Sequence, residues 1–239
     1  MVDSNRILKA LEKEIARHDR PENRVNYQQF FKERLAEPEG LRGPVLRRIS
    51  NLVYRDISHD TSSSILALCD QLLATEFRYR RFFAFDWATR QQQQFQPAEF
   101  RRFERWLKSY VDNWGACDSL GCGPMGLLIA QFPDLATKTH AWRRSRNRWL
   151  RRAAAVSLIV PVKRGLLLKE VFGTADALLM DQDDMVQKGY GWMLKEATRC
   201  FMDDVFAYVM RNKTRMPRTA LRYAIEKMPQ TLRKQAMAK

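Results

Sequence analysis

Helical periodicity runs along almost the entire chain of 239 residues, and this feature most limits the possible folds. Apolar residues recur at every third or fourth position, whereas the alternation of a β-strand is almost absent. Only 10 glycines and 9 prolines interrupt the pattern, which is too few for a many-turned β protein. The pattern predicts helices at 3–17, 25–36, 44–57, 62–74, 77–90, from Pro97 onward, and at 114–132, 135–144, 147–160, 166–179, 184–199, 203–212 and 217–227.

Many short helices joined by short turns pack either as a globular bundle or as a solenoid of helical pairs. The expected pairs recur roughly every 35–40 residues, which is the range of HEAT-like repeats. No change in composition marks a domain boundary. We therefore expect an all-α fold with a single domain over 1–239. We expect this domain to be a curved solenoid of HEAT-like helical pairs, which would gather the scattered arginines on a basic concave face.

The charge of the chain indicates a polyanionic partner. Lysines and arginines number 42 against 27 acids, which gives a net charge of +15, while 45% hydrophobic residues suffice for a core and exclude a disordered chain. Six arginines lie within 141–152, and nine basic residues lie within 211–239. Arginine suits bidentate contacts to phosphate. The alternative is a solvated surface with excess charge and no dedicated partner.

Membrane and disulfide signals are missing from the sequence. The longest nearly apolar stretch, 153–162, has ten residues, whereas a membrane span needs roughly 20. The amino end lacks the apolar region of a secretory signal. The four cysteines show no C-x-x-C spacing, so we expect neither disulfides nor a zinc site, and a reduced cytosolic setting fits best.

Trp192 lies on the wrong face of its helix for a core residue. The apolar stripe of the helix expected at 184–199 consists of Val186, Tyr190, Met193 and Ala197. Trp192 lies roughly 130° from the centre of this stripe. Its own face carries Lys188, Lys195 and Arg199. Such an indole could stack on a base, a sugar or a cation; alternatively, a neighbouring helix covers it.

Asp118 is the opposite case, a carboxylate one helical turn after Trp114. If the helix that begins at Pro97 continued unbroken, Asp118 would lie in the middle of an apolar stripe. If Asp112 or Asn113 caps a new helix, the Trp114–Asp118 pair lies in its first two turns. A carboxylate beside an indole is costly to bury unless it is paired or used, although proximity to a helix start would also explain it.

Two arginines lie on one side of the helix expected at 147–160. Arg148 and Arg152 flank its buried stripe, so each can face a phosphate or the Asp118 carboxylate, or can be merely structural. The acidic cluster at 181–184 is better explained as a helix cap than as a metal site. The three histidines belong to no catalytic motif, and the sequence contains no G-x-S-x-G, Walker or H-E-x-x-H motif.

Five segments of the chain form an ordered series of motifs. They are G-L-R-G-P at 40–44, W-x-x-x-D at 114–118, S-R-N-R-W-L-R-R-A-A at 145–154, Q-K-G-Y-G-W-M-L-K-E at 187–196 and R-T-A-L-R-Y-A-I-E at 218–226. Together they resemble the AlkD family of DNA alkylation-repair glycosylases over about 27–226. The spacing of 78 residues from Trp114 to Trp192 is also similar to that of the family.

The resemblance implies a monomeric base-excision enzyme of the bacterial cytosol and nucleoid that acts on double-stranded DNA containing alkylated bases. It would hydrolyse the N-glycosidic bond of N3- or N7-alkylated purines and leave an abasic site. Asp118 would stabilise the oxocarbenium-like sugar and position water, with Trp114 and Trp192 against the deoxyribose and its backbone. The implied DNA contacts are Arg152, Arg148, Lys188 and an aromatic residue near the amino end, for which Phe30 is the first candidate and Tyr27 the second. No metal and no organic cofactor is required.

Two other functions fit the same residues. A non-catalytic helical-repeat protein that binds branched or damaged DNA would share every basic feature and differ only in its use of Asp118. A protein-binding scaffold with an acidic peptide as its partner would explain the charge, but it would not explain the face that carries Trp192.

Overall fold

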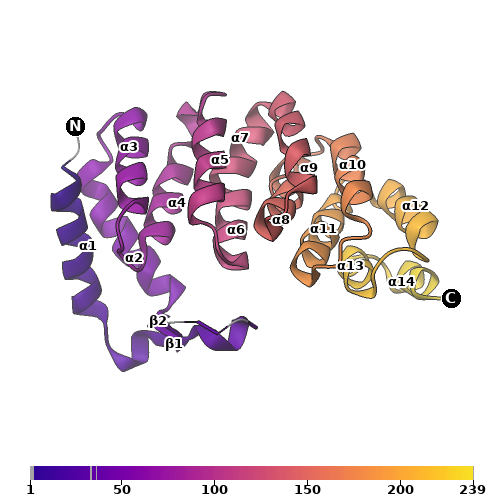
Figure 1. Cartoon of the computed structure of the whole chain (residues 1–239), viewed down its shortest axis with the longest axis horizontal. Helices are drawn as coiled ribbons and strands as arrows, with labels where there is room; N and C mark the ends of the chain where they lie inside the picture. Colours follow the sequence, from indigo (N-terminus) through magenta and orange to yellow (C-terminus); the bar gives the residue numbers. More distant parts are fainter. Residues whose placement is uncertain (1–2, 33, 36, 239) are drawn as a thin grey trace. The chain divides into compact units, whose positions relative to one another are not determined.

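Helices form nearly all the regular structure of the computed structural model, which describes residues 3–32, 34–35 and 37–238 (Figure 1). The chain forms two compact units, Met1–Gln91 and Gln92–Lys239. The only strands among the described residues are two strands of three residues each, so the predicted all-α class is confirmed. None of the described helices is both long enough and apolar enough to cross a membrane.

The described residues of the first unit form four α-helices. They are α1 (Ser4–His18), α2 (Gly43–Tyr54), α3 (Ser62–Leu73) and α4 (Arg80–Arg90), with short 3-10 turns η1 (Pro21–Asn23) and η3 (Arg55–Ile57). The side chain of Asp3 accepts hydrogen bonds from two backbone N–H groups and caps α1, and Thr61 caps α3 by accepting one from the Ser64 N–H. Their apolar faces meet in a core that includes Leu11, Ile49 and Trp87, all fully buried.

The prediction of a helix at 25–36 is wrong. Strand β1 (Arg24–Asn26) pairs antiparallel with β2 (Glu39–Leu41), and a 3-10 turn, η2 (Tyr27–Phe30), follows β1. The Tyr27 hydroxyl donates a hydrogen bond to the Leu41 carbonyl, and the Tyr27 N–H donates to Pro38. These pairings with a segment more than ten residues away replace the local helix. Ala36, the expected end of that helix, lies outside the described residues.

The second unit contains the remaining helices. They are η4 (Gln92–Gln94), α5 (Glu99–Tyr110), α6 (Trp114–Leu120), α7 (Gly126–Gln131), η6 (Pro133–Arg144), α8 (Arg148–Val156), α9 (Ile159–Lys163), α10 (Leu168–Leu178), α11 (Asp184–Ala197), α12 (Met202–Asn212), α13 (Arg218–Ala224) and α14 (Gln230–Met237). Helix α11 lies at the centre and packs against α8, α10 and α13. The predicted apolar stripe of α11 is fully buried at Val186, Tyr190, Met193 and Ala197.

The helix expected at 114–132 is interrupted by a π-helical turn at Gly121–Met125. Gly123 has non-helical backbone angles there, and Pro124 has no N–H to donate. Two glycines that flank the turn are tightly packed, since a Cβ on Gly121 would lie 2.6 Å from Val156 and a Cβ on Gly126 would lie 2.5 Å from the Gly121 carbonyl oxygen. Around this interruption α6 packs against α8 and α7 packs against α9, and the packing of α6 on α8 positions Asp118.

Candidate active site

Asp118 and Arg152 form a bidentate ion pair between α6 and α8. The side chain of Asn113 caps α6 and that of Asn147 caps α8, so local signals set where both helices begin. Arg152 Nε donates to Asp118 Oδ1 and Arg152 Nη2 donates to Oδ2, each at 2.8 Å. Arg152 Nη1 also donates to the Met185 carbonyl on α11. Three helices therefore fix the position of one carboxylate.

The pair is largely removed from solvent, but the carboxylate is not sealed. The Asp118 side chain is 17% exposed, whereas that of Arg152 is 6% exposed. Burial raises the pKa of the Asp118 carboxyl, and the guanidinium of Arg152 opposes that rise. The arginine therefore helps to keep the acid ionised, while the Asp118 side chain retains some exposure to solvent.

Two cysteines near Asp118 are poor nucleophiles. Cys117 Sγ–H points at the Trp149 carbonyl and Cys122 Sγ–H at the Val156 carbonyl, both on α8. Burial raises the pKa of the Cys122 thiol to about 12 and that of Cys117 further still. Both thiols are therefore neutral near pH 7, and Asp118 is the reactive group that this cluster offers.

Sequence reasoning missed Gly189, which makes room for the ion pair. A Cβ at Gly189 would lie 3.1 Å from Arg152 Cγ and 3.5 Å from Nη1, so the arginine lies directly on this turn of α11. Gly191, two residues on, lies against α13, where a Cβ would be 2.8 Å from the Ala220 carbonyl oxygen. The available signal was two glycines within one helical motif, because glycine inside a helix is costly unless packing requires it.

Both predicted tryptophans are partly exposed. Trp114 begins α6, one turn before Asp118, and Trp192 lies on α11 outside the buried stripe. The cations expected beside Trp192 are each paired with an acid. Their ion pairs are Lys188–Asp184 at 3.3 Å, Lys195–Glu226 at 3.1 Å and Arg199–Glu196 at 2.9 Å. The structure thus leaves part of the indole accessible and pairs the surrounding charges.

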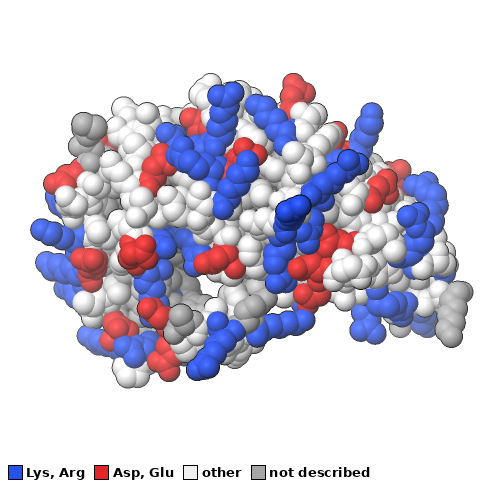
Figure 2. Space-filling model, in the orientation of Figure 1, with Lys and Arg blue, Asp and Glu red and all other residues white. Residues whose placement is uncertain are grey.

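Arg148 contacts the acidic cluster that precedes α11. Its Nε lies 2.7 Å from Asp183 Oδ2, and its guanidinium also lies over the Trp149 ring, 4.9 Å from the centroid. Asp183 caps α11, and Asp181 pairs with Arg151 at 2.6 Å. The interpretation of 181–184 as a cap is confirmed, and the cluster also joins α8 to α11. Figure 2 shows acidic and basic side chains close together over these two helices.

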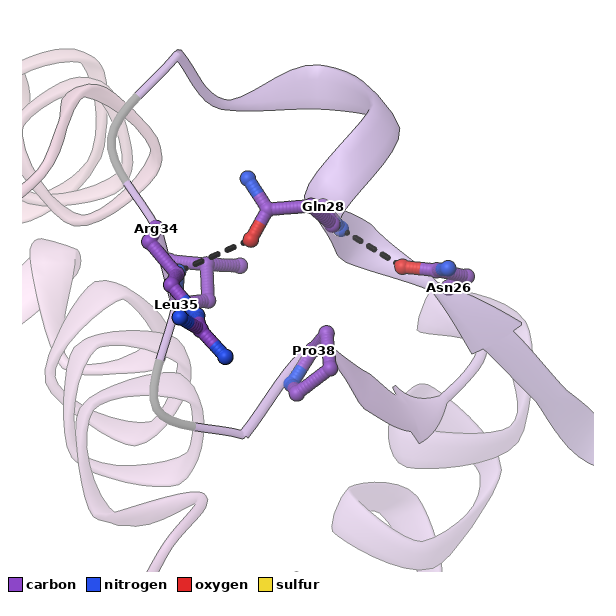
Figure 3. A pocket seen from close by; sticks show the side chains of 5 residues that line it. All are labelled: Asn26, Gln28, Arg34, Leu35 and Pro38. Atoms are coloured by element: carbon purple, nitrogen blue, oxygen red, sulfur yellow. Dashed lines mark hydrogen bonds between the residues drawn. The ribbon is translucent and has the colours of Figure 1, made fainter.

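Phe30 lies in the first unit, in the turn that follows β1. It is 54% exposed, and its ring contacts that of Tyr27 at a centroid distance of 6.4 Å. Beside this turn is an open hollow, in which the Gln28 side chain accepts a hydrogen bond from the Leu35 N–H (Figure 3). The exposed ring makes Phe30 better suited to an outside contact than Tyr27, which is half-buried and bonded to Leu41.

The family model of the DNA alkylation repair enzymes matches residues 11–228, which is most of the chain. The chain belongs to the DNA alkylation repair enzyme family. Membership in this family supports a role in the repair of alkylated DNA. The match includes all seven predicted site residues, from Phe30 to Trp192, and it extends over parts of both units.

A solved structure supports the same fold for this family member. It is that of a predicted DNA alkylation repair enzyme from Enterococcus faecalis, with a TM-score of 0.70 and 16% sequence identity, over 80% of this chain and 88% of that one. No curated protein matches the sequence. At this identity the likeness concerns the fold, so the chemistry must be argued from the residues of this chain.

Proposed function

We propose that this chain is a DNA glycosylase that hydrolyses the N-glycosidic bond of N3- or N7-alkylated purines in duplex DNA. Because the family match crosses the boundary between the two units, we also propose that 1–239 works as one functional domain. The observation that carries the proposal is the Asp118 carboxylate. It is held by two hydrogen bonds from Arg152, partly open to solvent and one turn from a partly exposed indole.

The chemistry needs little more than such a carboxylate. An alkylated purine is cationic, so it departs as a neutral base when the bond to C1′ breaks and takes both electrons, and no general acid is required. The sugar becomes oxocarbenium-like, and water then adds to C1′ and loses a proton, which leaves an abasic site. Asp118 stabilises the developing cation and orients the water. Trp114 and Trp192 contact the deoxyribose and the backbone of the lesion.

The ion pair is compatible with this role. A carboxylate offers about four lone-pair sites, and Arg152 occupies two of them, so one acceptor site on each oxygen remains. Arg152 acts first as a positioning residue, which is one of the roles that the sequence left open, whereas the family resemblance implied a direct phosphate contact. Its remaining N–H groups are proposed to meet a phosphate. Arg148 and Lys188, which are 31% and 27% exposed, would exchange an acidic partner for the DNA backbone.

The second candidate function is a helical-repeat protein that binds damaged or branched DNA without catalysis. The same ion pair favours it, because a buried carboxylate that pairs with arginine can serve the fold alone. The two functions differ only in whether Asp118 acts on the sugar, so one substitution can distinguish them.

The test is Asp118→Asn, which keeps the shape and one acceptor oxygen but removes the charge. We expect duplex binding to persist while release of 7-methylguanine falls by a factor of about 100 or more, corresponding to about 3 kcal/mol of lost transition-state stabilisation. The matched control is Asp203→Asn, which neutralises an exposed acid on α12. Equal base release by wild type and a folded Asp118→Asn would leave only the binding function.

A further inference from the structure

The outer face of α2, in the first unit, carries a set of exposed arginines that the proposed active site does not use. The buried face of α2 consists of Leu46, Ile49, Ser50 and Val53. Arg47 and Arg48 on α2, together with Arg55 at the start of η3 directly after it, point away from that face and are exposed. They line an open hollow together with His18 at the end of α1 and with Pro44, Ile49, Asn51 and Leu52.

This hollow has positive charge and no acid to neutralise it. No carboxylate lines it, and none of the three arginines forms an ion pair with an acid among the described residues of the first unit. Two acids of the same unit already have partners, since Glu14 pairs with Arg17 and Asp86 with Arg90, and the exposed Asp56 next to Arg55 does not line the hollow. Three like charges on one helix face repel each other, so the surface is better satisfied by a bound polyanion than by solvent alone.

The spacing of the arginines fits a phosphate backbone. Arg47 and Arg55 are eight residues apart, which is about 12 Å along a helix axis. A DNA duplex presents roughly seven phosphate charges over that length, with both strands counted. The guanidinium fork matches phosphate oxygens bidentately. Leu52, which is 44% exposed within the hollow, adds an apolar contact of the kind that a deoxyribose offers.

We propose that the arginine face of α2, defined by Arg47, Arg48 and Arg55, is a binding surface for the phosphodiester backbone of duplex DNA. This surface is a site in the first unit that does not depend on Asp118 or on base release. It does not distinguish one DNA sequence from another, because phosphate contacts contribute affinity and register but do not identify the bases.

The test compares two triple variants in their binding to an undamaged duplex, which offers no base to release. In the first variant, Arg47, Arg48 and Arg55 each become Gln. Each lost phosphate contact lowers the salt dependence of log K by about 0.9, so we expect the slope to fall by about 2.7. The control replaces Arg6, Lys9 and Lys13 by Gln. These three residues are exposed cations of α1 that do not line the hollow, and their replacement removes the same amount of charge.

The expected result is a large slope change for the α2 triple and a change of less than about one for the α1 triple. Equal changes in both variants would overturn the proposal, because they would reflect total charge alone. An unchanged slope in the α2 triple would overturn it too. The proposal would also be overturned if the α2 triple lost binding to a poly-glutamate peptide while it kept full DNA binding. All six positions are exposed, so unchanged melting temperatures confirm that the variants are folded.

Discussion

The arginines of α8 and those of α2 look alike in sequence, yet the structure uses them differently. On α8, Arg148, Arg151 and Arg152 each pair with a carboxylate 30 to 35 residues away. On α2, the three arginines of the outer face line a hollow that contains no acid. The comparison teaches that a basic segment is not by itself a nucleic-acid site, because what matters is whether the fold supplies acids to neutralise it.

The difference is also one of energy. A buried pair such as Arg152–Asp118 is costly to break, because the partner left behind is a charge without compensation. An exposed arginine can be removed from a folded protein with little effect on its stability. The α8 arginines should therefore act mainly on the free energy of unfolding and on the geometry of Asp118, whereas the α2 arginines should act on DNA affinity.

The largest expected effect on stability comes from Arg152→Ala. This change leaves Asp118 and the Met185 carbonyl without their donor, so we expect the free energy of unfolding to fall by about 3 kcal/mol. Its counterpart, Arg48→Ala, should change that free energy by no more than about 0.5 kcal/mol. Urea unfolding followed by circular dichroism measures both. A small loss for Arg152→Ala would mean that the ion pair contributes little to the stability of the fold. The α8 and α2 arginines would then not differ in their effect on stability.

The sequence predicts local features of the fold well. Caps at Asp3 and Asn113 follow from residue type and position, since a side-chain oxygen at a helix start satisfies nearby N–H groups. The buried stripe of α11 follows from helical spacing. The helix expected at 25–36 failed because β1 pairs with β2, and that tertiary pairing overrides local propensity. The final helix, α14, was missed.

The candidate site was also only partly predictable, because it depends on tertiary packing as well as on local sequence. The sequence pointed to Asp118 and Trp114 by their spacing, and it left Arg152 free to face either a phosphate or Asp118. Only the packing of α6, α8 and α11 decides between them, because the two residues are 34 positions apart. Gly189 contributes because its lack of a side chain leaves room for Arg152. The sequence cannot show this role, since it depends on how α8 packs against α11.

Smaller effects are expected from substitution of the two glycines of α11. One substitution should change mainly stability and the other mainly base release, so the pair distinguishes the two contributions of the region around α8. Gly191→Ala forces a Cβ to within 2.8 Å of the Ala220 carbonyl oxygen, and such overpacking costs about 1–3 kcal/mol. Gly189→Ala brings a Cβ to 3.1 Å from Arg152 Cγ and 3.7 Å from the Arg152 carbonyl oxygen, which is a milder contact, and alanine gains about 1 kcal/mol of helix propensity. We therefore expect Gly189→Ala to remain stable but to release 7-methylguanine more slowly, because Arg152 shifts and Asp118 loses its orientation.

Thermal melts and single-turnover base release measure these two variants. The matched control is Gly173→Ala on α10, where the nearest atom to an added Cβ would be Arg143 Nη1 at 3.7 Å. It should be as active as wild type and slightly more stable. If Gly189→Ala released base at the wild-type rate, the contact between this glycine and Arg152 would have no part in positioning the acid.

The smallest expected effect is a displacement of the pH profile, and it distinguishes the two arginine regions by titration. Base release requires ionised Asp118, and burial raises the pKa of that carboxyl against the opposing effect of Arg152. Release should therefore be constant at neutral pH and should decline on acidification at a higher pH than an ordinary aspartate would give. DNA binding through the α2 arginines should stay constant over the same range, since a guanidinium does not titrate there. Single-turnover rates, corrected for uncatalysed depurination, and binding at each pH supply both curves. If binding and release declined together, the loss would come from DNA affinity, and the acid at position 118 would not control the chemical step.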